Sequence, residues 1–300
     1  MKVSVQLNSL RYYREDWYDD VSKECNKITG LETIKGFSDD ADIVLFSGTP
    51  EPGKNTKFMQ SISAGVNHLN FSKISENILI SSNADGYSIP VAETVIALLL
   101  SYAKKICFSN NEIHNGIYQQ LEDKDYLTLY NKKLGILGYG GIGKESAKLA
   151  SAFGMKIYVY SRSYEKDVYS EYMDIKNIME NCDFVLISFP LNQYTMGIIN
   201  KNMLNLFKGF AIINAGRGEI VDHDDILNHL KNHKNFYYLT DVWYNEINMT
   251  EKIPDNVLIT PHMAGMSDNV MLPVQKACNN IKNYINGNPG NVVNRNDYIK

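Results

Sequence analysis

The chain has 300 residues, of which 44% are hydrophobic and 21% charged, so it can bury a substantial core and is globular rather than disordered or fibrous. Its formal net charge is −4, with both signs scattered, so no overall field attracts nucleic acid or an anionic membrane. At about 150 residues per domain, this length predicts two domains or one large one.

The first residues and the cysteine pattern indicate the cellular compartment in which the protein is expected. MKVSVQLNSLRYYRED has no apolar run of signal-peptide length, and the most apolar segment, residues 91–100, is about half as long as a membrane span. The cysteines lie far apart and include no Cys-x-x-Cys pair, which argues against a zinc site or a disulfide framework. They are Cys25, Cys107, Cys182 and Cys278. We expect a cytoplasmic protein that binds no metal.

Short runs rich in Val, Ile, Leu, Phe and Tyr recur along the chain, separated by stretches with helical spacing of apolar residues. These runs are the predicted strands, at residues 3–7, 43–47, 58–62, 78–82, 134–137, 157–160, 184–188, 211–214, 237–240 and 257–260. Apolar strands alternating with helices are typical of parallel sheets covered on both faces. Because these strands are many for one open sheet, we predict an α/β fold with two doubly wound, Rossmann-like sheets.

No Gly/Ser-rich or Pro-rich linker marks a domain boundary. The best candidate is residues 86–90, where a loop ends the first group of strands and Ser88 begins a predicted helix. With a final helix over residues 268–285, we expect a discontinuous domain of residues 1–87 plus 267–300, and a second domain of residues 88–266.

The sharpest local signal is a strand followed by a Gly-x-Gly-x-x-Gly turn and a helix. Gly138 permits the tight turn, Gly140 lets the backbone approach a pyrophosphate, and Gly143 allows close packing of helix on strand. Gly141 and Ile142 open the helix, whose first N–H groups and dipole favour an anion. A structural turn explains many lone glycine triplets, but in this context the pattern predicts dinucleotide binding.

The next strand ends in Ser161-Arg162-Ser163, where a site selective for NAD usually places an acidic residue that accepts from the ribose 2′-hydroxyl. A guanidinium and two hydroxyls can instead hold a 2′-phosphate. We therefore expect NADP(H) to be preferred, with NAD(H) possible. The alternative is that Arg162 is a solvated residue of a polar turn.

Three later segments, residues 214–222, 241–246 and 260–265, place polar residues at the ends of predicted strands. In a parallel sheet these carboxyl ends meet at one edge, where ligands bind, so Arg, Glu and His side chains from them are expected to converge on the cofactor. The alternatives are a histidine satisfied by backbone, a structural ion pair of Arg217 with Glu246, and a strand-end cap at Asp241.

With these segments, the chain resembles the D-isomer-specific 2-hydroxyacid dehydrogenase family, which includes glyoxylate/hydroxypyruvate reductases and phosphoglycerate dehydrogenases. The resemblance covers most of the chain and includes Ala64-Gly65-Val66-Asn67-His68, Val91-Ala92-Glu93, Phe189-Pro190, Thr195 and Gly197. It implies that residues 88–266 bind the dinucleotide, that the discontinuous domain binds substrate, and that the active site lies in a cleft between the two.

The resemblance also implies roles for single residues. Arg217 would bind the substrate, Glu246 would partner the catalytic His262, and His262 would donate or accept the proton. Asp241 would hold the nicotinamide carboxamide. The other cofactor positions are Pro190, Thr195, Ala215, Gly216 and Gly265, and the substrate-carboxylate loop holds Ala64 and Gly65.

The chemistry supports these roles independently. Reduction of a 2-oxo acid needs a hydride, a cation for the carboxylate and the developing oxyanion, and an acid that protonates that oxygen. Arg217 and His262 supply the last two, and a carboxylate at Glu246 favours the charged imidazole and orients its ring. We predict an NADP(H)-preferring reductase of small 2-oxo acids. The alternatives are an NAD-dependent phosphoglycerate dehydrogenase and a dinucleotide-sensing protein like the corepressors related to this family.

Three further features complete the expectations. Ile247 stands where the family commonly has Pro, and the interval from Glu246 to His262 is short, so this loop can differ. The helix after Pro90 is apolar on nearly every face, which predicts a homodimer interface. His229 and His233 lie on a predicted helix without the Glu of a zinc-protease motif, so we expect a solvated face there.

Overall fold

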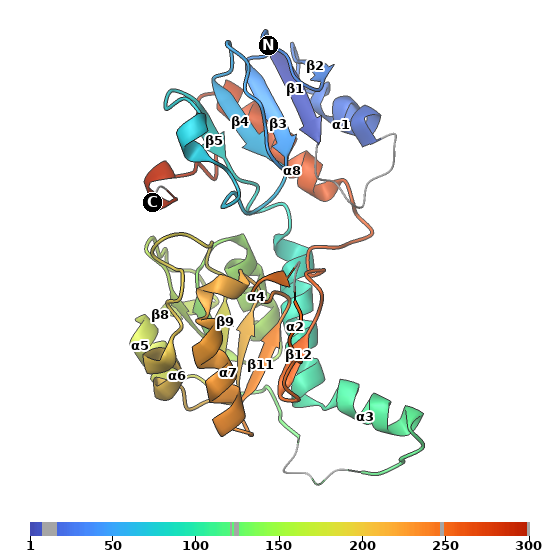
Figure 1. Cartoon of the computed structure of the whole chain (residues 1–300), viewed down its shortest axis with the longest axis vertical. Helices are drawn as coiled ribbons and strands as arrows, with labels where there is room; N and C mark the ends of the chain where they lie inside the picture. The colour runs from blue at the N-terminus through green and yellow to red at the C-terminus, as the bar shows by residue number, and fades with distance from the viewer. Residues whose placement is uncertain (8–16, 121, 123–125, 247–248, 299–300) are drawn as a thin grey trace. The chain divides into compact units, whose positions relative to one another are not determined.

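The computed structural model describes residues 1–7, 17–120, 122, 126–246 and 249–298. The chain divides into two compact units (Figure 1). Unit 1 comprises Met1–Tyr87 and Ser267–Lys300, and unit 2 comprises Ser88–Met266. In the described residues, each unit is built on one sheet whose neighbouring strands are all parallel, which confirms the predicted α/β class with two doubly wound sheets.

Unit 1 holds a sheet with the strand order β2-β1-β3-β4-β5. The strands are β1 (Lys2–Leu7), β2 (Glu32–Lys35), β3 (Ile43–Ser47), β4 (Phe58–Ser61) and β5 (Leu79–Ser81). Helices α1 (Trp17–Cys25) and α8 (Leu272–Ile285) pack on one face, and the segment around the 3-10 helix η1 (Phe71–Lys73) packs on the other. The side-chain amide of Asn83 donates to the carbonyl of Pro273 at 2.8 Å, so the end of the chain is tied into the first unit.

Unit 2 holds a sheet with the order β12-β11-β10-β9-β6-β7-β8. Its strands are β6 (Lys133–Leu137), β7 (Lys156–Tyr160), β8 (Ser170–Tyr172), β9 (Phe184–Ile187), β10 (Ala211–Asn214), β11 (Tyr237–Thr240) and β12 (Val257–Ile259). The order reverses between β6 and β9. In such sheets ligands bind beyond the carboxyl ends of the strands at this point, so the turn after β6 occupies the favoured position.

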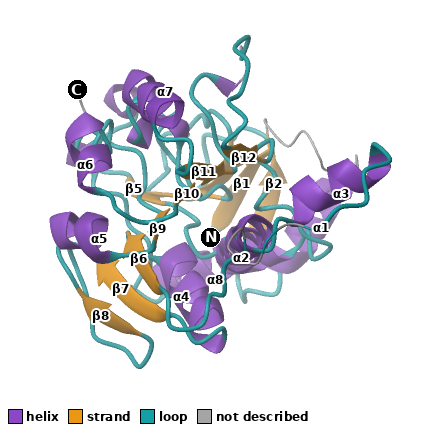
Figure 2. Ribbon diagram, turned by 90° about the horizontal axis from the view of Figure 1, so that it is seen from below, coloured by secondary structure: helices purple, strands orange, loops and turns teal. Residues whose placement is uncertain are grey.

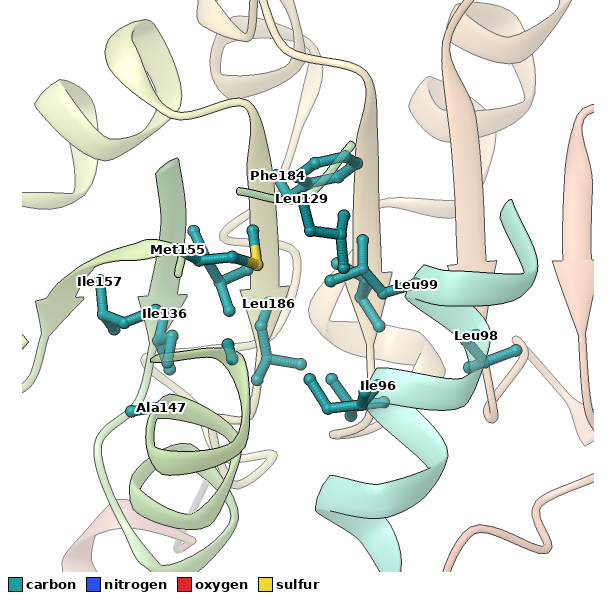
Figure 3. Packing of buried hydrophobic residues seen from close by; sticks show 14 of the residues in the cluster. Ile96, Leu98, Leu99, Leu129, Ile136, Ala147, Met155, Ile157, Phe184 and Leu186 are labelled. Atoms are coloured by element: carbon teal, nitrogen blue, oxygen red, sulfur yellow. The ribbon is translucent and has the colours of Figure 1, made fainter. Parts of the chain in front are cut away.

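Helices cover both faces of the unit 2 sheet, as Figure 2 shows for α4 on one side and α5 on the other side of β6. One face carries α2 (Ser88–Ala103) and α4 (Gly141–Ala152). The other carries α5 (Ile175–Asn181), α6 (Lys201–Leu206) and α7 (His223–Asn232). Alternate strand residues pack on opposite faces of the sheet. Phe184 and Leu186 of β9 face Ile96 and Leu99 of α2 in Figure 3, and Val185 and Ile187 pack on the other side.

Three element predictions need correction. The edge strands β2 and β8 have the sequences ETIK and SEY, which hold too few apolar residues to be recognised as strands. Polar residues are common on edge strands, because one side of the strand is unpaired. The final helix begins at Leu272 and not at residue 268, because Pro273 occupies its first turn, where proline is favoured.

The apolar character of helix α2 does not by itself indicate a homodimer interface. Most of its apolar side chains are buried within its own unit: Val95 and Leu99, for example, are 1% and 0% exposed, whereas Ile89 in its first turn is 47% exposed. The helix packs on α4 and on strands β10 and β11. Its apolar character is therefore explained without a second copy of the chain.

The solvated face predicted for α7 is wrong at His229, which is only 9% exposed. Its ring stacks on His233 with centroids 4.0 Å apart and meets the edge of Phe236 at 4.8 Å. Burial, with the nearby His233, lowers the pKa of His229 to about 4. Among the described residues no group of three or more His, Cys, Asp or Glu side chains could hold a metal ion.

This burial predicts an acid-sensitive unit 2. Above pH 6.5 His229 is neutral in both the folded and the unfolded chain, but between about pH 6.5 and 4 the unfolded chain binds a proton that the folded one does not. The free energy of unfolding should fall over this pH range by at most about 3 kcal/mol. His229→Phe keeps an aromatic ring and should flatten this fall in urea unfolding at a series of pH values. An exposed control, His114→Phe, should retain it; identical pH profiles for all three proteins would contradict the prediction.

The cysteines are free thiols, but two of them meet in the core of unit 1. The sulfurs of Cys25 in α1 and Cys278 in α8 lie 2.7 Å apart. Spacing along the chain could not indicate this contact, because 253 residues separate the two positions. Of the helices in the described residues, none is both long and apolar enough to cross a membrane.

Candidate active site

The glycine turn between β6 and α4 has two glycines that the fold itself requires. Gly138 has φ +102°, and a Cβ there would lie 2.9 Å from the carbonyl carbon of Ser188. A Cβ on Gly143 would lie 2.3 Å from the carbonyl oxygen of Gly138. A side chain at Gly138 would push the turn away from the backbone that follows β9, and one at Gly143 would push α4 away from the turn. Both glycines are therefore explained without a ligand.

Gly140 differs from these two, because nothing in the chain explains it. Its φ of −82° suits any residue, and apart from Gly140 itself and its two chain neighbours no heavy atom of the described structure lies within 4 Å of a Cβ built there. It precedes α4, whose N-terminus no side chain caps among the described residues, so the N–H groups that follow are open to an anion. An open space at a glycine before an uncapped helix fits the pyrophosphate of a dinucleotide.

Two neighbouring loops reach the same edge of the sheet. Strand β7 pairs with β6 and ends before Ser161-Arg162-Ser163, in which Arg162 and Ser163 are exposed. After β9, the loop with Pro190 and Thr195 is closed by hydrogen bonds: the Thr195 hydroxyl donates to the Pro190 carbonyl at 2.6 Å. The proposed cofactor residues of these loops therefore lie at the carboxyl ends of strands next to the glycine turn.

The turn after β10 presents Arg217 and is held by Asn214. The Asn214 amide oxygen accepts from the Gly216 N–H at 3.0 Å, and its NH₂ donates to the Arg217 carbonyl at 3.0 Å. The guanidinium donates from Nη1 to the Gly216 carbonyl at 2.7 Å. A Cβ on Gly218 would lie 2.2 Å from the carbonyl oxygen of Trp243. This close approach brings the Arg217 turn against the loop that follows β11.

Glu246 and His262 are paired in the structure. Nδ1 of His262 lies 2.7 Å from Oε2 of Glu246, and Oε1 accepts from the Trp243 N–H at 2.9 Å. Burial alone raises the pKa of Glu246, but these hydrogen bonds and the charges of His262 and Arg217 lower it overall. Glu246 is therefore ionised at neutral pH and interacts electrostatically with His262 and Arg217. The side chains of His262 and Glu246 are 47% and 35% exposed, so the pair is open to a ligand.

Asp241 holds the loop that carries His262. Its Oδ1 accepts from the Thr260 hydroxyl at 2.6 Å and the Met263 N–H at 2.9 Å, and its Oδ2 accepts from the Ala264 N–H at 2.9 Å. The Asp241 carbonyl accepts from the His262 N–H at 2.9 Å. A buried carboxylate, 4% exposed, thus fixes both sides of the histidine.

The backbone at this pair is strained. His262 has φ +52° and Asn245 has φ +51°, in the left-handed region that residues other than glycine rarely adopt. Such conformations cost of the order of 1–3 kcal/mol each and persist where surrounding contacts determine them. Here the hydrogen bonds of Asp241 and of the Trp243 N–H supply those contacts. Strain of this kind is concentrated at functional sites.

The structure therefore brings together, within unit 2, the Arg217, Glu246 and His262 side chains. Ala215, Gly216 and Gly265 lie in the same strand-end loops, whereas Ala64 and Gly65 follow β4 in unit 1. Sequence reasoning missed Asn214 and Gly218, which shape the arginine turn. Both belong to the polar segment after β10. Asn214 makes hydrogen bonds within this segment, whereas the Trp243 carbonyl that approaches Gly218 lies on another one. The expected difference after Glu246 falls on Ile247, which lies outside the described residues.

The model of the D-isomer specific 2-hydroxyacid dehydrogenase NAD-binding domain matches residues 96–264, more than half of the chain. The chain belongs to this family. The hydroxypyruvate reductase of Thermotoga maritima is 32% identical over 223 residues, covering 71% of this chain and 72% of that protein. The hydroxypyruvate reductase of Blautia hydrogenotrophica is 28% identical over 288 residues and 89% of each chain.

A protein of solved structure is also similar to this chain. The glycerate dehydrogenase related protein from Thermoplasma acidophilum is 34% identical, with a TM-score of 0.70 over 95% of this chain and 100% of that one. The protein is thus an oxidoreductase of the D-2-hydroxyacid dehydrogenase family with an NAD(P)-binding domain.

Proposed function

We propose that the protein is an NADP(H)-preferring reductase of small 2-oxo acids, similar to glyoxylate and hydroxypyruvate reductases. The observation that carries this proposal is the 2.7 Å contact of His262 with Glu246 in the electrostatic neighbourhood of Arg217. A proton donor, an orienting carboxylate and a cation are what reduction of a 2-oxo acid requires of the protein. The family membership supports the same reaction class.

Arg217, His262 and Glu246 have separate roles in this reaction. When bound, the nicotinamide cofactor supplies the hydride for the substrate carbonyl carbon. Arg217 binds the substrate carboxylate and offsets charge that develops on the carbonyl oxygen. Because Nδ1 of His262 faces Glu246, Nε2 is the nitrogen left to donate a proton to that oxygen. Glu246 favours the imidazolium and fixes its orientation.

The remaining site residues belong to the same proposal. Gly138, Gly140, Gly141, Ile142 and Gly143 would hold the pyrophosphate, and Pro190, Thr195, Ala215, Gly216, Asp241 and Gly265 would line the nicotinamide half. The two oxygens of a carboxylate offer about four acceptor sites, so Asp241 would accept from a carboxamide in addition to its three donors. Ala64 and Gly65 would bind the substrate carboxylate through backbone N–H groups.

Removing the charge of Glu246 should move the pH dependence of catalysis. Glu246→Gln keeps the size of the side chain but no longer favours the imidazolium form of its partner. Reduction needs the protonated ring and oxidation the neutral one. The rate of reduction should begin to fall at a lower pH than in wild type, and oxidation should persist to lower pH. Unmoved pH–rate profiles in both directions would remove Glu246 from the proposed pair.

The cofactor preference should depend on Arg162. A charged hydrogen bond to the 2′-phosphate contributes about 1.5–3 kcal/mol, or roughly 10- to 150-fold in affinity. Arg162→Ala should raise the Kd of NADPH by that order and leave the Kd of NADH nearly unchanged. Ser161→Asp should go further, because it repels the phosphate and offers the ribose an acceptor. If wild type binds both cofactors equally, or if Arg162→Ala weakens both alike, the NADP(H) preference is wrong.

A substrate panel tests the function as a whole. Glyoxylate, hydroxypyruvate, pyruvate and phosphohydroxypyruvate, each assayed with NADPH and NADH, should include a substrate that is turned over at an ordinary enzymic rate, about 1–10³ per second. Turnover of phosphohydroxypyruvate alone would favour the phosphoglycerate dehydrogenase alternative. Cofactor binding without turnover of any of the four would favour the dinucleotide-sensing alternative.

We further propose that the protein acts in the cytoplasm as a homodimer, for which helix α3 (Ile106–His114) offers a better surface than α2. Every residue of α3 is at least partly exposed, and Ile106 and Ile113, seven positions apart on one face, are 52% and 55% exposed. Burial of such a face against a second copy would remove apolar surface from water. Sedimentation equilibrium of wild type and Ile113→Asp measures the oligomeric state. A monomeric wild-type protein would contradict the proposal.

A further inference from the structure

The loop that would read the 2′ position of the cofactor is tied to the glycine turn by one side chain. Strand β7 ends at Tyr160 and β8 begins at Ser170, so residues 161–169 form a loop with Arg162 near its start. Asp167, near the other end of the loop, accepts a hydrogen bond from the hydroxyl of Tyr139 at 2.5 Å. Tyr139 lies between Gly138 and Gly140 of the turn after β6.

Asp167 is the centre of this attachment. Its Oδ1 accepts from the N–H groups of Tyr169 and Ser170 at 2.9 and 3.0 Å and from the Ser170 hydroxyl at 2.9 Å, and its Oδ2 accepts from Tyr139. Burial alone raises the pKa of Asp167, but these hydrogen bonds lower it overall, so the group is ionised at neutral pH. The phenol therefore donates to a charged acceptor, the stronger class of hydrogen bond.

The ring of Tyr139 adds packing to the hydrogen bond. It is only 7% exposed and lies 6.1 Å, between centroids, from the ring of Tyr164 in the same loop. Tyr164 in turn donates its hydroxyl to the Ser170 carbonyl at 2.9 Å. The loop is thus held at both Tyr164 and Asp167 by a residue whose backbone belongs to the pyrophosphate turn.

We propose that Tyr139 is a positioning residue that determines cofactor specificity: through Asp167 it fixes residues 161–169, and with them Arg162, relative to the glycine turn. This inference rests on the proposed function of the site as a dinucleotide site. The two parts of the cofactor that the turn and the loop would contact, the pyrophosphate and the adenosine ribose, are held at a constant separation. A loop kept at a matching separation can distinguish a 2′-phosphate from a 2′-hydroxyl, whereas a displaced loop can contact neither well.

The experiment removes a single hydroxyl. Tyr139→Phe keeps the ring packed on Tyr164 but loses the bond to Asp167. We expect faster hydrogen exchange in residues 161–169 of the cofactor-free protein, with exchange in β6 unchanged. We also expect the ratio of the NADPH and NADH dissociation constants to move toward 1 by about 10-fold, the lower end of the effect of a charged hydrogen bond. Tyr118→Phe, at a position 87% exposed, is the matched control and should change neither measurement.

A double-mutant cycle separates positioning from a general structural effect. If Tyr139 acts through Asp167, then Tyr139→Phe combined with Asp167→Asn should change the ratio no more than the stronger single variant does. Loss of both affinities in equal proportion, an unmoved ratio, or additive effects of the two substitutions would overturn the inference. A wild type that prefers NADH would overturn the proposed NADP(H) preference and leave this inference standing if the ratio still moves toward 1. Equal wild-type affinities would overturn both.

Discussion

Replacement of His262 by alanine is expected to lower the rate of 2-oxo acid reduction by about 10²- to 10⁴-fold, the usual contribution of a positioned proton donor. The loss should appear in kcat, because the proton moves only in the transition state. The dissociation constant of NADPH should change little, because the proposed role of the ring is toward the substrate. Steady-state kinetics and cofactor titration of the purified variant measure both quantities.

Two further variants make this result specific. His262→Gln keeps a side chain that can hydrogen-bond to Glu246 but cannot titrate near neutral pH, so it should be as inactive as the alanine variant if proton transfer is the role. Lys231→Ala, at an exposed position in α7, should retain full activity. Wild-type kcat in a folded His262→Ala protein would refute the proposed mechanism.

Replacement of Arg217 by alanine should have the second largest effect, a loss of roughly 10²- to 10³-fold in kcat/KM, as is typical when one donor to a developing oxyanion is removed. The Michaelis constant should rise as well, because the same guanidinium binds the substrate carboxylate. Arg217→Lys keeps the charge but not the planar fork and should recover only part of the activity.

The other arginine at this edge of the sheet provides the contrast. Arg162→Ala is expected to weaken NADPH binding, whereas Arg217→Ala should leave NADPH affinity intact and reduce substrate turnover. Measurement of the cofactor Kd and the substrate KM in both variants distinguishes the two roles. If Arg217→Ala weakens the cofactor and leaves the substrate KM unchanged, then Arg217 belongs to the cofactor site instead.

Much of the fold could be predicted because its signals are local. The buried strands of unit 2 are continuous apolar runs, and strands 211–214 and 237–240 were predicted with the bounds that the structure has. The edge strands β2 and β8 could not be predicted, because partly exposed strands have a composition similar to that of loops. The buried His229 escaped for a related reason: the pattern of a helix cannot show which neighbour covers its polar positions.

The sequence by itself determined the α/β class, the glycine turn and the strand ends that carry Arg217, Glu246 and His262, because each depends on residues near one another in the chain. Only the tertiary structure decided which of these side chains meet. The His262–Glu246 contact, the approach of Gly218 to Trp243 and the Tyr139–Asp167 bond all join different loops. The register and order of the strands set the distances between those loops, and both arise from packing of the whole sheet.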